Sequence, residues 1–136
     1  MDKGRYNGPE RRKSKRLRVD FIVVYRVRRP IRLFMVIKNK EVSALMTDLS
    51  EGGMAILTNY DIPVSTTLLI KFTLINPPAT ENERVRMMEI TGEVRYNTYL
   101  GNNEHRLGIC FTHISKEDRT AIVNFIKTVS DQQQGS

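Results

Sequence analysis

The chain has 136 residues, of which 40% are hydrophobic and 27% charged, a mixture typical of folded globular domains. It is long enough for one domain, its single cysteine excludes an internal disulfide framework, and no apolar run reaches the ~20 residues that span a bilayer. Because residues 1–16 contain no apolar stretch, we expect no secretory signal and a soluble, cytoplasmic protein.

The positive charge is concentrated near the N-terminus. The formal net charge is +7, yet residues 1–32 carry 12 basic and 3 acidic side chains, whereas residues 33–136 carry 10 basic and 12 acidic ones. A basic segment favours an anionic partner, such as a nucleotide, a nucleic acid or an acidic membrane surface, and a solvated tail is the alternative. Glycines, a proline and the lack of apolar periodicity predict that residues 1–18 form an extended, flexible basic arm.

The middle of the chain is predicted to form six or seven short strands. Alternation of apolar and polar residues, β-branched and aromatic enrichment, and turn residues between the segments indicate them. A turn is expected at 48–53, a loop at 59–63 and a hairpin turn at 101–103. The predicted strands are 19–27, two within 31–47, then 54–57, 66–75, 85–99 and 106–112.

A helix is predicted at the C-terminal end. Ser115 and Asp118 have the spacing of a helix N-cap box, and a polar tail is expected at 130–136. Strands followed by one helix favour an all-β fold: a small antiparallel β-barrel of six to seven strands, with the helix covering one opening. The apolar residues at helical spacing are Ile122, Phe125, Ile126 and Val129.

Residues that could support catalysis are few. Cys110 and His113 have a C-x-x-H spacing, but no second pair of ligands completes a zinc site, and the remaining histidine is His105. The sequence contains neither a P-loop nor a G-x-G-x-x-G motif. We therefore expect no catalytic residue, no metal and no cofactor, and we predict that the protein is not an enzyme.

Two clusters of residues are candidates for binding. The first consists of three arginines, whose planar guanidinium groups can bind phosphate oxygens, pair with the O6/N7 edge of guanine, or stack on a purine. They are Arg11, Arg12 and Arg16. In the predicted turn, Asp48 can accept hydrogen bonds from a guanine edge or hold an arginine. Ser50 can donate or accept, and Gly53 allows close backbone approach.

The sequence has these two clusters in this order, with a β-rich pattern. In this it resembles the PilZ domain, a bacterial receptor module for cyclic diguanylate (c-di-GMP). Residues 12–16 match its R-x-x-x-R motif and residues 48–53 match its [DN]-x-S-x-x-G motif, with 31 residues between Arg16 and Asp48. Residues 106–111 and 115–119 look like the closing strand and helix of the family. The resemblance covers about residues 9–129 and implies a PilZ-like barrel over 19–129.

The resemblance also implies a ligand and its site. Arg12 and Arg16 would contact phosphates and guanines, and Asp48, Ser50 and Gly53 would hold a guanine. In the family, an arginine at the position of Arg11 is associated with two stacked ligand molecules per chain. The expected function is a c-di-GMP receptor or adaptor that changes conformation and signals to a partner protein.

Two alternatives remain open from the sequence. One is a β-barrel that binds single-stranded nucleic acid through the same basic arm, although such surfaces usually need aromatic stacking platforms. The other is a ligand-blind PilZ-like subunit of a larger assembly, against which the two intact motifs argue. We expect c-di-GMP and a downstream protein as the partners, rather than nucleic acid or a membrane.

Overall fold

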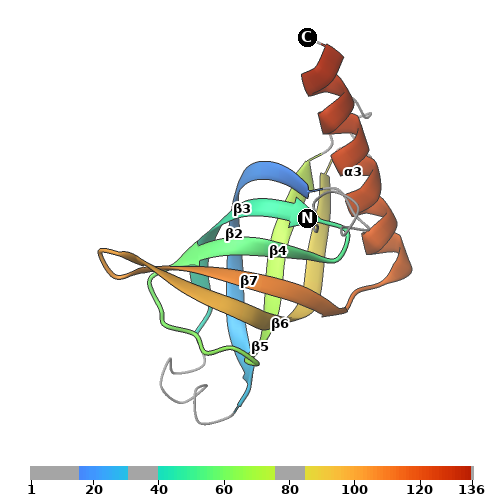
Figure 1. The fold of residues 1–136 in the computed structure, drawn as a ribbon. Helices are drawn as coiled ribbons and strands as arrows, with labels where there is room; N and C mark the ends of the chain where they lie inside the picture. The colour runs from blue at the N-terminus through green and yellow to red at the C-terminus, as the bar shows by residue number, and fades with distance from the viewer. Residues whose placement is uncertain (1–15, 31–39, 76–84, 136) are drawn as a thin grey trace, which may run out of the picture.

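The computed structural model describes residues 16–30, 40–75 and 85–135, with side chains as far as Asp131. Within these residues it contains six strands and one helix (Figure 1). The strands pair antiparallel with their neighbours in the order β2-β3-β4-β7-β6-β5, and β5 pairs with β2 to close the barrel. The elements are β2 (Arg16–Arg29), β3 (Val42–Ser50), β4 (Gly53–Thr58), β5 (Thr67–Ile75), β6 (Val85–Gly101), β7 (Glu104–His113) and α3 (Lys116–Gly135).

The hydrophobic core fills the inside of the barrel, as the alternating pattern predicts. Along β5 every second side chain is buried, and the same alternation places Leu107, Ile109 and Phe111 of β7 inside. Burial of apolar area on this scale is the main stabilising contribution to a small domain. The buried residues of β5 are Leu68, Ile70, Phe72 and Leu74.

Several element boundaries differ from those predicted. Strand β2 begins at Arg16 instead of residue 19, because residues 16–18 pair with residues 48–50 of β3. The predicted turn at 48–53 is shorter, because β3 continues to Ser50 and β4 begins at Gly53. Of the two strands predicted within 31–47, β3 accounts for one, and residues 31–39 lie outside the described residues.

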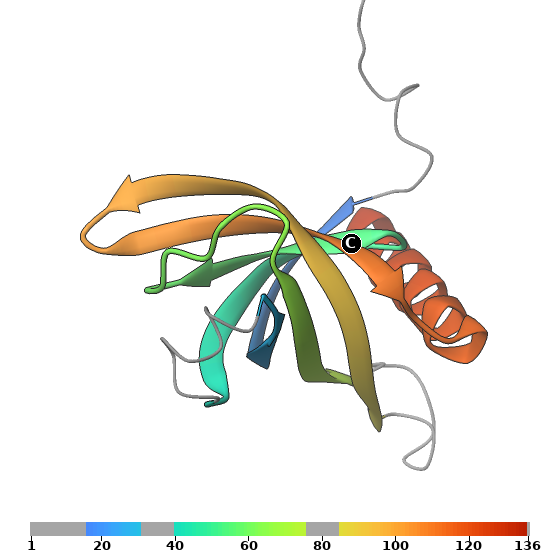
Figure 2. The ribbon, with the colours of Figure 1, turned by 90° about the horizontal axis from the view of Figure 1, so that it is seen from below.

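Helix α3 lies at one end of the barrel, and the β6–β7 hairpin extends from the other (Figure 2). The Ser115 hydroxyl accepts a hydrogen bond from the Asp118 amide at 3.0 Å, which confirms the predicted cap. Phe125 of α3 packs against Phe21 of β2, with 5.6 Å between ring centroids. Within the described residues, no helix combines the length and hydropathy that a membrane crossing requires.

The helix is longer than the sequence pattern indicated. We expected a polar tail from residue 130, but α3 continues to Gly135 and the Ser130 side chain is buried. The reason is that residues 130–134 contain no helix breaker, and glutamine has a good helix propensity, so nothing ends the helix at Val129. The hairpin turn at 101–103 is confirmed, and its three residues have φ angles of 91°, 52° and 60°.

Candidate ligand-binding site

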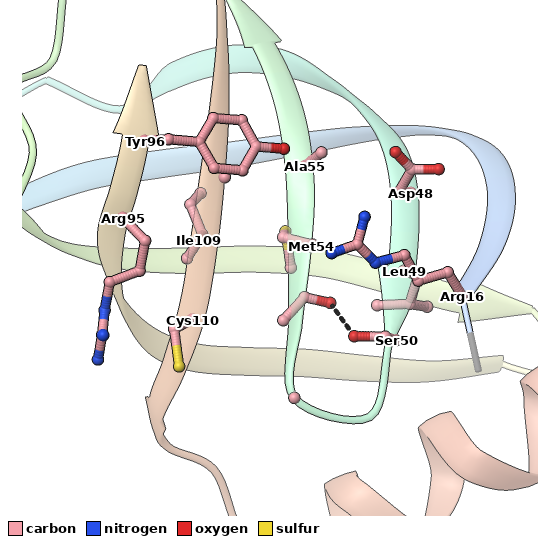
Figure 3. A pocket seen from close by; sticks show the side chains of 13 residues that line it. Arg16, Asp48, Leu49, Ser50, Met54, Ala55, Arg95, Tyr96, Ile109 and Cys110 are labelled. Carbon is pink, nitrogen blue, oxygen red and sulfur yellow. Dashed lines mark hydrogen bonds between the residues drawn. The ribbon is translucent and has the colours of Figure 1, made fainter. Parts of the chain in front are cut away.

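A pocket of about 370 Å³ lies on the outer face of the barrel, over β3, β4, β7 and β6 (Figure 3). Four of the predicted site residues line it, although they come from different parts of the chain. The other two, Arg11 and Arg12, lie outside the described residues. The four residues are Arg16, Asp48, Ser50 and Gly53.

A β-bulge places Asp48 on the outer face. Relative to β4, strand β3 contains one extra residue, Thr47, between Met46 and Asp48. Strict alternation from the buried Met46 would point Asp48 into the core. The bulge reverses the alternation, so Leu49 is buried instead and the Asp48 carboxylate faces the pocket.

Asp48 forms an ion pair with Arg106 of β7. The Arg106 Nη2 donates a hydrogen bond to Oδ2 of Asp48, and the two side chains are 39% and 19% exposed. Half-burial strengthens such a charge-assisted pair relative to one in full solvent. Among the described residues, the second carboxylate oxygen, Oδ1, has no hydrogen-bond partner and could accept from a ligand donor.

The turn between β3 and β4 is held by hydrogen bonds to its own backbone and to β7. The Ser50 hydroxyl donates to the carbonyl of Gly53 at 3.2 Å, and the carbonyl of Gly52 accepts from the Phe111 amide at 2.8 Å. A Cβ atom at Gly53 would overlap the carbonyl oxygen of Ile109. Glycine is therefore required here by the close approach of β4 to β7, which is a structural reason separate from the ligand contact expected of Gly53.

A second bulge forms the opposite wall. The register of β6 against β7 shifts between Val94 and Tyr96, so Arg95 is an extra residue and Tyr96 lies on the outer face opposite Gly108. The Tyr96 side chain is 39% exposed, and its ring covers the position that a Cβ atom of Gly108 would take. The pocket thus has a half-exposed aromatic face, on which a planar base can stack.

Two cations line the pocket from opposite sides. Arg16 is exposed, pairs with Ser50 across the β2–β3 ladder, and extends its guanidinium across β3 towards β4 (Figure 3). Arg95 points away from Arg16, and its Nε lies 2.9 Å from a carboxylate oxygen of Glu93. Of the two, Arg16 is therefore the one directed at the pocket.

Sequence reasoning gave no binding role to several residues that form this site. Among them, Arg95, Tyr96, Gly108 and Cys110 line the pocket, and Arg106 pairs with Asp48 from the row of residues next to it. The irregular alternation of residues 85–99 was the available signal, because a break in the period of two indicates a bulge. Among the described residues, no group of three His, Cys, Asp or Glu side chains could hold a metal ion.

The family model of the PilZ domain matches residues 10–128. The chain belongs to the PilZ domain family. The matched range includes Arg12, Arg16 and the turn around Ser50, and two of these, Arg16 and Ser50, line the pocket of this PilZ domain. Among proteins of curated function, none matches the chain in sequence.

Solved structures of other PilZ proteins share the fold. The chain resembles the Bacillus subtilis inhibitor of motility MotI/DgrA with a TM-score of 0.67 and 17% identity, over 91% of this chain and 52% of that one. It also resembles the c-di-GMP-containing PilZ domain of Escherichia coli YcgR. The TM-score is 0.61 and the identity 14%, over 92% of this chain and 95% of that one. It resembles the MrkH–c-di-GMP complex of K. pneumonia with a TM-score of 0.62 and 12% identity, over 91% of this chain and 54% of that one. This PilZ domain therefore spans about half the length of MotI and MrkH.

Proposed function

We propose that this PilZ domain is a receptor for c-di-GMP. The observation that carries the proposal is the pocket, in which Arg16 of one motif lies beside Asp48, Ser50 and Gly53 of the other. The two motifs are 31 residues apart in sequence, and a cation beside a hydrogen-bonding turn suits a ligand that combines phosphates with guanines. Two structures of the same fold, YcgR and MrkH, contain c-di-GMP.

Each residue has a distinct role in this proposal. Arg16, together with Arg11 and Arg12, binds phosphate oxygens and guanine edges or faces. Asp48 accepts hydrogen bonds from the N–H groups of a guanine, and Ser50 contributes a hydroxyl beside it. Tyr96 offers the aromatic face against which the base lies.

We propose that the signal passes to a partner protein and that the chain performs no chemistry itself. Ligand binding would bring Arg11 and Arg12 to the pocket and neutralise cations there, which changes the surface charge that a partner meets. The ligand-binding turn also adjoins α3, because Arg119 lies 3.9 Å from Glu51. An exposed pair of this kind is weak, so it can break at little cost when the turn is occupied.

Calorimetric titration with c-di-GMP tests the proposal, with cyclic di-AMP and a random single-stranded oligonucleotide as comparison ligands at two salt concentrations. We expect saturable binding of c-di-GMP and much weaker binding of the other two. Oligonucleotide binding that falls steeply with salt would favour the nucleic-acid alternative. Absence of binding to all three would favour a ligand-blind subunit.

A further inference from the structure

The partner of Asp48 in the ion pair comes from a strand that is not its neighbour. Strand β4 lies between β3 and β7 in the ring, so the Arg106 side chain crosses the outer face of β4 to reach the carboxylate. Its own ladder partner on β4 is Leu57, whereas Asp48 pairs with Ala55. Arg106 therefore approaches Asp48 diagonally, from the row of residues next to the pocket.

Arg106 does not line the pocket, whereas Asp48 does. Nη2 of Arg106 donates to Oδ2 of the carboxylate, and this charge-assisted hydrogen bond restricts the rotamers that the Asp48 side chain can adopt. An unpaired aspartate on a strand surface would sample several rotamers and would lose that freedom when a ligand bound. Because the ion pair already restricts the Asp48 side chain, less conformational entropy is lost when a ligand binds.

We propose that Arg106 is a positioning residue for guanine recognition, which it serves by holding Asp48 in its binding geometry. This inference rests on the proposed function. Guanine presents N–H donors on its Watson–Crick edge, and a fixed carboxylate accepts them, whereas the N1 of adenine is an acceptor that a carboxylate repels. Arg106 thus contributes to base selectivity without touching the ligand.

A double-mutant cycle separates positioning from direct contact. Calorimetry would measure c-di-GMP binding by the whole chain and by Arg106→Ala, Asp48→Ala and the double variant. We expect Arg106→Ala to weaken binding about tenfold, Asp48→Ala to weaken it more, and the double variant to match Asp48→Ala, because residues in one network are not additive. Arg106→Lys keeps the charge but lacks the planar guanidinium, so it should restore only part of the affinity that Arg106→Ala loses.

Base selectivity provides the second measurement. Arg106→Ala should lower the ratio of c-di-GMP affinity to cyclic di-AMP affinity, because the carboxylate that discriminates the bases is no longer fixed. The matched control is Arg86→Ala, which breaks another surface ion pair, with Asp118, away from the pocket. It should leave both affinities unchanged, and thermal melting would confirm that all variants fold.

The outcomes distinguish this inference from the proposed function. If the unmodified chain does not bind c-di-GMP, the proposed function fails and the role of Arg106 fails with it. If the chain binds but the losses of the two single variants add, or Arg106→Ala leaves affinity and selectivity unchanged, the receptor function stands and the positioning role alone is overturned.

Discussion

Tyr96 and Gly108 lie opposite one another on β6 and β7, and the tyrosine ring occupies the space above the glycine where a side chain would be. A Cβ atom at Gly108 would overlap several ring atoms of Tyr96. The absence of a side chain at residue 108 is therefore what allows the aromatic wall of the pocket to lie flat on the sheet. The bulge at Arg95 supplies the other condition, because it turns Tyr96 outward.

We predict that Gly108→Ala displaces the Tyr96 ring and weakens both stability and ligand binding. Forcing a methyl group into an occupied position typically costs about 1–3 kcal/mol. Urea denaturation should show this loss in the free energy of unfolding, and calorimetry should show weaker c-di-GMP binding. The matched control for stability is Gly52→Ala, because a Cβ atom there has no atom within 4 Å. Equal stability of the two variants would contradict the account of Gly108.

We predict that Arg16→Ala greatly weakens c-di-GMP binding while the fold remains intact. Arg16 is exposed at the start of β2, so its truncation removes little packing, but it removes a cation directed at the pocket. Loss of a bidentate contact costs about 1–3 kcal/mol. Arg12→Ala should have a similar effect. Arg28→Ala is the control, since it removes the same charge from the far end of β2 and does not line the pocket. Calorimetry showing equal affinities for the Arg16 and Arg28 variants would argue against the site.

We predict that the protein loses stability in alkaline solution through Tyr25. Burial raises the pKa of Tyr25 from 10.0 to about 12, opposed by its hydrogen bond to Thr58 at 2.8 Å and assisted by nearby Tyr60. The folded state holds the phenolic proton more tightly than the unfolded state. Its contribution is therefore complete below pH 10 and is lost as the pH rises towards 12, by about 2–3 kcal/mol in all.

Urea denaturation of the unmodified chain and of Tyr25→Phe between pH 8 and pH 11 measures this effect. At pH 8, Tyr25→Phe should be less stable by about 1 kcal/mol, because the Thr58 hydroxyl loses its partner. The difference should shrink as the pH rises. Tyr99→Phe changes an exposed ring and serves as the control. Stabilities of the chain and of Tyr25→Phe that fall in parallel above pH 10 would contradict the prediction.

The strands, the capped helix and the barrel class follow from short-range patterns, which is why the sequence predicts them. Alternation marks β5, and the box from Ser115 to Asp118 marks the start of α3. The motif residues Asp48, Ser50 and Gly53 are close in sequence, so their grouping is also visible there. Their position was less accurate, because β3 continues to Ser50 and so places Asp48 on a strand instead of in a turn, where the bulge at Thr47 turns it to the outer face.

The remaining parts of the site depend on how the barrel closes. Arg106 and Asp48 are 58 residues apart, and they meet only because β4 pairs with β7 and so skips two strands of the chain order. Tyr96 reaches the pocket through a bulge in β6, which shifts the side chains beyond it to the other face. The irregular alternation of residues 85–99 indicates that a bulge is present, but it does not identify the residue at which the ladder slips, and no local pattern specifies the long-range pairing.

Our last prediction concerns the number of ligands. Arg11 immediately precedes the R-x-x-x-R motif, so this segment has one more arginine than the motif requires. Two intercalated c-di-GMP molecules bring four phosphates and four guanines, and a third arginine can satisfy more of them than two can. We therefore expect calorimetry and sedimentation to give two ligands per chain, and Arg11→Leu to give one while binding persists. A ratio of one for the unmodified chain would show that Arg11 is merely solvated, and the roles of Arg12 and Arg16 would stand unchanged.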